Sequence, residues 1–161
     1  KLKRDIKMKH KNKNTILNIK KTNFEYEIVE SFKAGLVLEG WMVKAIRARK
    51  ISASNSVYVN IFKGEAYLEG INITSLKETN SFKDINEQPR IKLLLNKKEL
   101  NKLIGAQQEA GFTIALQNIF WEKHLVKANI ALAKGKNVRD KRRTIKERDI
   151  KRETARELKK Y

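Results

Sequence analysis

The sequence predicts a small, mainly β domain: a closed antiparallel barrel of about six strands with two or three short helices, flanked by basic extensions. Three observations predict it. Short runs of β-branched, aromatic and aliphatic residues recur along the chain and are bounded by turn residues. Only two internal segments have the period of a helix, too few to connect parallel strands. The excess of positive charge is concentrated at the two ends, which are therefore expected to lie outside the barrel.

Charge divides the 161-residue chain into three parts. It has 37 Lys and Arg against 18 Asp and Glu, a formal charge of +19. Residues 1–21 and residues 134–161 carry +8 each, which leaves +3 for the remaining 112 residues. We therefore expect a basic N-terminal arm (residues 1–18), a barrel (residues 19–133) and a basic C-terminal tail (residues 134–161). The expected partner is nucleic acid, whose phosphates release counterions on binding; an anionic membrane surface is the alternative.

Several classes are excluded by composition. The chain has no Cys, and its two His, His10 and His124, cannot form a zinc cluster or a catalytic triad. We therefore expect no enzyme and no cofactor. No apolar run is long enough to span a bilayer, and no hydrophobic segment follows the Lys-rich start as in a secretory signal. A cytoplasmic protein is expected.

The N-terminal third changes from a polar start to strands. Residues 1–18 have few apolar side chains and no usable period, so we expect them to be disordered without a partner. Residues 24–28 alternate as a half-buried strand does. Leu36 to Leu38 resume an extended segment, and Gly35 between them is expected to form a bulge or bend.

Residues 40–49 have a helical period. Apolar side chains fall on adjacent stripes, and Lys44 and Arg47 lie three apart on the other side. The spacing of Lys44 and Arg47 fits a solvent-exposed helix face and a binding surface equally well.

A hairpin is predicted next. Residues 57–62 are rich in β-branched and aromatic side chains, Lys63-Gly64 is a turn signal, and residues 65–73 form the returning strand. Residues 75–87 show no periodicity and are expected to form a surface loop that ends at Pro89, the only proline.

A strand and the clearest helix of the chain follow. Residues 90–95 are expected to form a strand that exposes Lys92 on a basic face. Asn96 and Glu99 have the spacing of a capping box, and the apolar residues behind them recur with the period of a core-facing helix. Gly111 is the expected stop.

A second hairpin completes the barrel. Residues 112–121 and 125–132 read as strands joined by a three-residue turn. The total of about six strands with few helices favours a closed antiparallel barrel of the oligonucleotide-binding (OB) type.

The C-terminal tail has no sustained apolar face. Its opposite-charge pairs at helical spacing are offset by like-charge pairs, so a helix would be marginal alone. We expect the tail to fold as a helix only on contact with a polyanion.

Four strings carry a family resemblance. They run from Phe32 to Arg47, from Arg90 to Asn96, from Leu132 to Lys136 (LAKGK) and from Asp140 to Arg142 (DKR). In this order they resemble the motifs of the small protein B family, the SsrA-binding proteins of bacterial trans-translation. The resemblance covers residues 26 to 158.

The resemblance implies an OB-type barrel that binds the tRNA-like domain of transfer-messenger RNA (tmRNA) and accompanies it to stalled ribosomes. Elongation factor Tu would be met indirectly, through the aminoacylated tmRNA. The C-terminal tail is implied to enter the decoding centre, at the 16S rRNA of the small subunit, and to fold along the empty mRNA channel. The protein would act as a monomer, away from membranes, and without making or breaking a bond.

Site residues are implied at matching positions. On the barrel these are the tmRNA contacts Arg47, Leu94, Asn96 and Lys127, with Lys44 and Lys92 added from charge and placement and Lys33 at a position where the family has Glu. On the ribosome side they are Lys134, Gly135, Lys136, Arg139, Asp140, Lys141, Arg142 and the apolar Leu158. The chain is expected to turn away from the barrel at Gly135.

Three departures change the expected contacts. Lys33 replaces a carboxylate acceptor by a cation that prefers phosphate, and Met42 replaces a second Glu. Arg139 stands where the family has His or Tyr, so its guanidinium plane would have to stack on a base.

Two other classes of protein are the alternatives. A structural ribosomal or general RNA-binding protein with basic extensions fits the composition, and would be inseparable from assembled subunits. An RNA-modifying enzyme would need a converging nucleophile, metal or acid-base set, which the sequence does not suggest.

Overall fold

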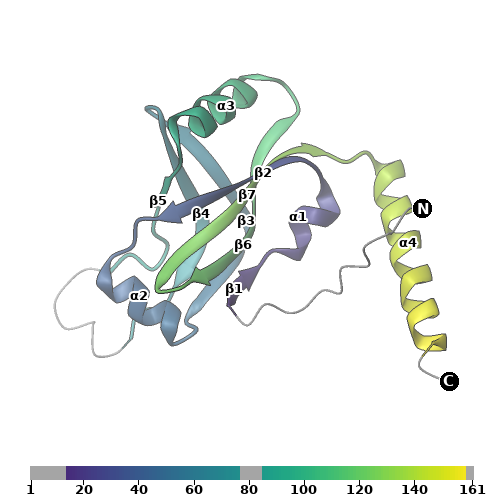
Figure 1. The fold of residues 1–161 in the computed structure, drawn as a ribbon, viewed down its shortest axis with the longest axis horizontal. Helices are drawn as coiled ribbons and strands as arrows, with labels where there is room; N and C mark the ends of the chain where they lie inside the picture. The colour runs from purple at the N-terminus through teal and green to yellow at the C-terminus, as the bar shows by residue number, and fades with distance from the viewer. Residues whose placement is uncertain (1–13, 77–84, 159–161) are drawn as a thin grey trace.

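A computed structural model describes residues 14–76 and 85–158 and contains a seven-stranded antiparallel sheet that curls into a nearly closed barrel of the OB type (Figure 1). The elements in chain order are β1 Thr15–Asn18, α1 Lys20–Glu25, β2 Tyr26–Leu36, α2 Gly40–Arg47, β3 Ile51–Phe62, β4 Glu65–Ile73, β5 Ile91–Leu94, α3 Lys97–Gln108, β6 Phe112–Glu122, β7 Leu125–Gly135 and α4 Val138–Glu157. The strand order is β1-β6-β7-β2-β5-β4-β3, and β3 lies against β6 and β1 to close the barrel. The predicted fold class is confirmed.

The core follows from the alternation of the strands. Ala34 of β2, Ala128 of β7 and Ile119 of β6 are paired across the sheet and are all completely buried. Leu103 of α3 is also fully buried, as predicted for its apolar stripe. The Asn96 backbone N–H donates to Glu99 Oε2 at 3.0 Å, which confirms the predicted start of α3.

The first strand contradicts part of one expectation. Thr15–Asn18, expected to be disordered, form β1 because their backbone pairs with β6, about 100 residues later in the chain. The rest of the N-terminal arm, residues 1–13, lies outside the described residues. The strand expected at residues 24–28 begins only at Tyr26, because Phe24 belongs to α1.

Gly35 is not a bulge. The strand β2 is continuous through it, and Gly35 pairs with both Lys127 of β7 and Leu94 of β5. A Cβ atom at Gly35 would lie 3.3 Å from the Cβ of Leu94, so the glycine permits this close approach. The register shift in β2 lies instead between Ile28 and Glu30.

The hairpin of β3 and β4 is confirmed and carries a large bulge. Ala53 pairs with Ile71 and Tyr58 with Glu69, so four residues of β3 lie opposite Gly70 alone. Gly70 has a φ of +86°, and a Cβ there would lie 2.1 Å from the Ser56 carbonyl oxygen. Only glycine fits this position without displacing the bulge.

The end of the barrel differs from the expected boundary. Strand β7 continues through Lys134 to Gly135, which pairs with Tyr26, so the chain does not turn at Gly135. The Lys136 backbone N–H donates to the Glu25 carbonyl at 2.9 Å, and α4 begins two residues later. Figure 1 shows α4 standing beside the barrel rather than covering it.

Candidate nucleic-acid interface

The outward-facing residues of β1, β6, β7, β2 and β5 form a polar surface that we call the outer face. One row across the sheet is Thr15, Phe120, Lys127, Gly35 and Leu94, and the next is Asn18, Asn118, Asn129 and Lys33. Successive strand residues point to opposite faces, so these rows lie on the side away from the buried core. Asn129 Nδ2 donates to Asn118 Oδ1 at 2.9 Å across the sheet.

Glu122 joins two of the predicted contact residues. Lys33 Nζ lies 2.7 Å from Glu122 Oε1, and Lys127 Nζ pairs with Glu122 Oε2. Hydrogen bonds from Lys127 and Lys33 lower the pKa of Glu122 from 4.5 to about 2, so the carboxylate stays ionised between the two ammonium groups. At the position where the resemblance implies a Glu, Lys33 therefore still has a carboxylate beside it.

Replacing the Glu122 carboxylate should lower stability in a pH-dependent way. Glu122→Gln is expected to reduce the free energy of unfolding at pH 7. Because the pKa is lower in the folded state, the carboxylate stabilises the fold above pH 4.5, and this stabilisation is lost as pH falls towards 2. Urea unfolding at several pH values between 7 and 2.5 measures the difference. A gap between variant and wild type that keeps its full size at the lowest pH contradicts the assignment.

Leu94 ends the first row, and Lys92 and Asn96 lie beside it. Leu94 is 55% exposed, although it is a large apolar side chain in the middle of a sheet. Such exposure on a polar face suits contact with a ribose or base. Lys92 donates a hydrogen bond to Glu65 Oε1 of β4. This bond raises the pKa of Lys92 and is the main reason that the pKa of Glu65 is lowered. Asn96 is exposed at the start of α3.

The two predicted contacts on α2 are not part of the outer face. Lys44 and Arg47 are exposed on that helix, and the Arg47 guanidinium lies 5.9 Å from the centre of the Trp121 ring. Met42 is 7% exposed and packs into the core, so this departure from the family motif lies inside the molecule.

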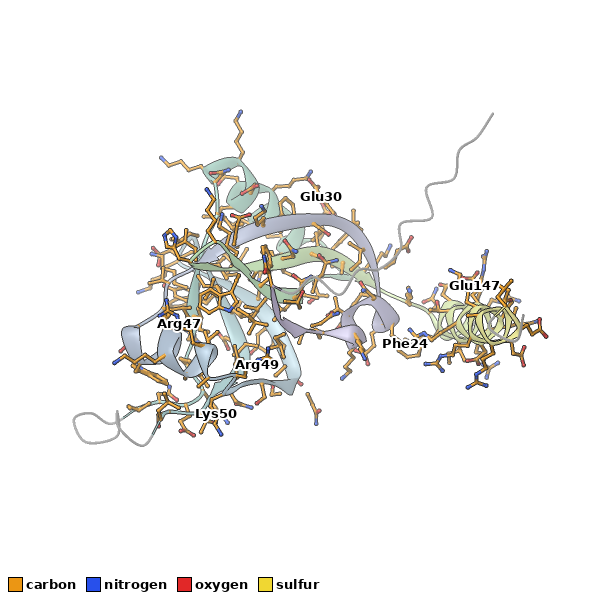
Figure 2. All side chains as sticks on the ribbon, turned by 60° about the horizontal axis from the view of Figure 1, so that its bottom comes forward. Phe24, Glu30, Arg47, Arg49, Lys50 and Glu147 are labelled. Carbon is orange, nitrogen blue, oxygen red and sulfur yellow. The ribbon has the colours of Figure 1, made fainter. Side chains whose placement is uncertain are left out.

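The predicted ribosome-facing residues extend from β7 into α4. Lys136 Nζ donates to the Asn23 carbonyl at 3.1 Å, which fixes the start of the C-terminal tail against α1. Arg139, Asp140, Lys141 and Arg142 occupy the first turns of α4, and Leu158 caps it with 75% of its surface exposed. Among residues whose side chains are described, none in α4 is buried. Arg148 lies over the Phe24 ring at 5.5 Å, a contact between α4 and α1. Figure 2 shows Phe24 on the side of the barrel nearest α4.

Opposite charges at helical spacing support α4. Arg143 Nε lies 3.2 Å from Glu147 Oε1, and Arg152 lies 3.8 Å from Asp149. Each such exposed pair contributes only about 0.3–0.5 kcal/mol. No described side chain of α4 is buried, as the lack of an apolar face in the sequence predicts. That the tail folds only on contact with a polyanion stays a prediction.

Sequence reasoning missed several residues of this surface. The sequence pattern places Glu122 in the turn, although it ends β6, and it assigns no face to Asn118 or Trp121. The alternation of Asn118, Phe120 and Glu122 with buried Ile119 carried that signal.

Two further findings concern other chemistries. Within residues 14–76 and 85–158, no three His, Asp or Glu side chains cluster as metal ligands would. In the same ranges no helix has both the length and the apolar character to cross a bilayer.

The fold and this surface define the class: an antiparallel OB-type barrel with Lys33 and Lys127 on one sheet face and a strongly basic helix, α4, standing beside the barrel. The model of the SmpB protein family matches residues 16–160. The chain therefore belongs to the SmpB protein family.

Individual relatives agree with the family match. An SsrA-binding protein of Coxiella burnetii (strain CbuK_Q154) is 45% identical over 147 residues, covering 91% of this chain and 92% of that protein. One from Pseudomonas syringae pv. syringae (strain B728a) is 44% identical over 150 residues, 93% of each chain. Among solved structures, a chain from "tmRNA-SmpB: a journey to the center of the bacterial ribosome" superposes with a TM-score of 0.58 at 29% identity, covering 78% of this chain and 86% of that one.

Proposed function

We propose that the chain binds the tRNA-like domain of tmRNA (SsrA RNA) and delivers it to stalled ribosomes for trans-translation. The outer face would hold the tRNA-like domain, with Lys33, Lys92, Leu94, Asn96 and Lys127 as its contacts. The C-terminal tail would enter the decoding centre and the empty mRNA channel. Family membership and the names of the relatives support the RNA partner and the ribosome.

The separation of two cationic surfaces is the observation that carries this proposal. Lys127 and Lys134 are seven residues apart on β7, which is about 23 Å along a strand. The outer face lies at the first of these positions, and α4 leaves the barrel just beyond the second. Two basic surfaces at opposite ends of one rigid strand suit a protein that contacts two RNAs at once.

The remaining details follow from this role. The protein would act in the cytoplasm as a monomer, and elongation factor Tu would reach it through the aminoacylated tmRNA. Binding and mimicry of a missing part of tRNA would be its whole activity, with no catalytic step.

Lys127→Ala tests the outer face. Loss of one charge-assisted phosphate contact is expected to weaken binding of the tRNA-like domain about tenfold. The slope of log affinity against log salt should fall by about one. The matched control is Lys98→Ala, which removes an exposed lysine of α3 outside the outer face. Fluorescence anisotropy with labelled RNA measures both; equal effects of the two variants would refute the assigned surface.

Co-purification tests the partner. Tagged protein from its native extract should enrich tmRNA, as read by RNA sequencing. Recovery of only assembled ribosomal subunits with their rRNA would instead identify a structural ribosomal protein.

A further inference from the structure

A second basic site lies at the C-terminal end of α2. A cavity of about 270 Å³ there is lined by Arg47 and Arg49 together with Trp121 and residues of β1 and β3. Figure 2 shows Arg47, Arg49 and Lys50 gathered around this end of the helix. Trp121 and Phe120 are consecutive in β6 and therefore point to opposite faces of the sheet. Trp121 and the two arginines therefore lie on the other side of the sheet from Phe120 and Lys127, and the cavity borders the outer face only at Thr15, which lines both.

The backbone fixes Arg49 at this place. The Arg49 N–H donates to the Ile46 carbonyl at 3.0 Å and the Lys50 N–H to the Ala45 carbonyl at 2.9 Å, the two bonds of a Schellman helix end. This motif puts Arg49 at a φ of +58°, where glycine is preferred. Strain alone does not single out Arg49, because Lys63 has a similar φ of +50° in a hairpin turn. What distinguishes Arg49 is the cavity that it lines.

The charges of the cavity are not compensated. Within the described residues, neither Arg47 nor Arg49 forms an ion pair with a carboxylate. Arg47 is held over the Trp121 ring, which leaves its N–H groups free to donate. The volume is below the ~300–1,000 Å³ typical of sites for drug-sized ligands, so it suits one chemical group rather than a whole cofactor. Two guanidinium groups match the oxygens of one phosphate.

We propose that this cavity binds one backbone phosphate of the tRNA-like domain, with Arg47 and Arg49 as donors and Trp121 as the positioning residue for Arg47. The inference rests on the proposed function for the identity of the RNA. It adds Arg49, on a second face of the barrel, to the contacts named above. The bound RNA would therefore reach around the edge formed by β1.

Arg49→Gly gives a test that unfolding cannot imitate. The change removes one cation and also relieves the left-handed backbone, so the midpoint of thermal unfolding should rise. Affinity for the tRNA-like domain should nevertheless fall about tenfold, with a salt slope smaller by about one. Lys63→Gly is the matched control, because it removes the same charge and the same strain away from the cavity. It should raise the unfolding midpoint and leave affinity within about twofold.

The outcomes separate this site from the proposed function. Trp121 becomes the sole tryptophan in a Trp41→Phe background, and its emission should change when the tRNA-like domain is added. No RNA binding by that protein or by wild type would refute the proposed function itself. Normal binding that Arg49→Gly leaves unchanged, with constant Trp121 emission, would refute the cavity alone. A lower unfolding midpoint for Arg49→Gly would show that Arg49 serves the helix end instead.

Discussion

A chain that ends at Lys136 is expected to bind the tRNA-like domain of tmRNA nearly as well as the whole chain and to lose peptide tagging on stalled ribosomes entirely. The barrel should survive the truncation because α4 contributes no described side chain to the core. Lys136 keeps its bonds to the Asn23 and Glu25 carbonyls, so the end of β7 remains fixed. The truncation removes a net charge of +6 with residues 137–161. Because physiological salt screens this charge from an RNA bound at the outer face, the affinity should fall by less than about tenfold.

A second variant separates the effect of the tail's net charge from the effect of its residue order. A chain in which residues 137–161 are permuted keeps the same +6 and the same composition. It should restore the affinity for the tRNA-like domain but not tagging in a reconstituted translation system with a truncated message. Loss of RNA binding in the truncated chain, with its circular dichroism unchanged, would contradict the division into barrel and tail.

Gly70→Ala should cost more stability than any other glycine substitution considered for this barrel. The added Cβ would lie 2.1 Å from the Ser56 carbonyl oxygen and 2.9 Å from Ser54 Oγ, so the bulge of β3 must open. The left-handed backbone adds its own penalty of about 1–2 kcal/mol. The total loss in the free energy of unfolding is expected to be roughly 3 kcal/mol or more.

Two other glycines serve as controls for this prediction. Gly64 has a φ of +74° but open space around it, so Gly64→Ala should show the backbone penalty alone. Gly105 lies within α3 with open space, and Gly105→Ala should stabilise by about 0.5–1 kcal/mol. Urea unfolding ranks the three variants. Equal losses at Gly64 and Gly70 would show that the bulge yields without cost.

Elements specified by their own residues could be predicted from the sequence. The Asn96 and Glu99 spacing gave the start of α3, and the Lys63-Gly64 turn gave the hairpin of β3 and β4. In both, the decisive contacts join neighbours in the chain. The strand predicted at residues 125–132 likewise follows from its own residues, and β7 occupies that range.

Features that depend on distant residues could not be predicted in this way. Strand β1 exists because β6 offers it a free edge, and nothing within Thr15–Asn18 shows that edge. Lys33 was predicted as a contact residue, but its bond to Glu122 joins residues 89 apart in the chain. The resemblance to a family supplied candidate positions for the site, whereas the pairing of those positions with acids came only from the folded structure.

Because α4 is held at its base near Lys136, a small rotation there displaces the far end of the helix by a much larger distance. Its 20 residues span about 30 Å, while its base is fixed by the bonds that Lys136 makes to α1. A rotation of about 10° at that pivot would therefore carry Leu158 through about 5 Å. A small adjustment of α1 is thus magnified at the far end of the helix. The two hydrogen bonds from Lys136 to the Asn23 and Glu25 carbonyls therefore set the direction in which α4 points.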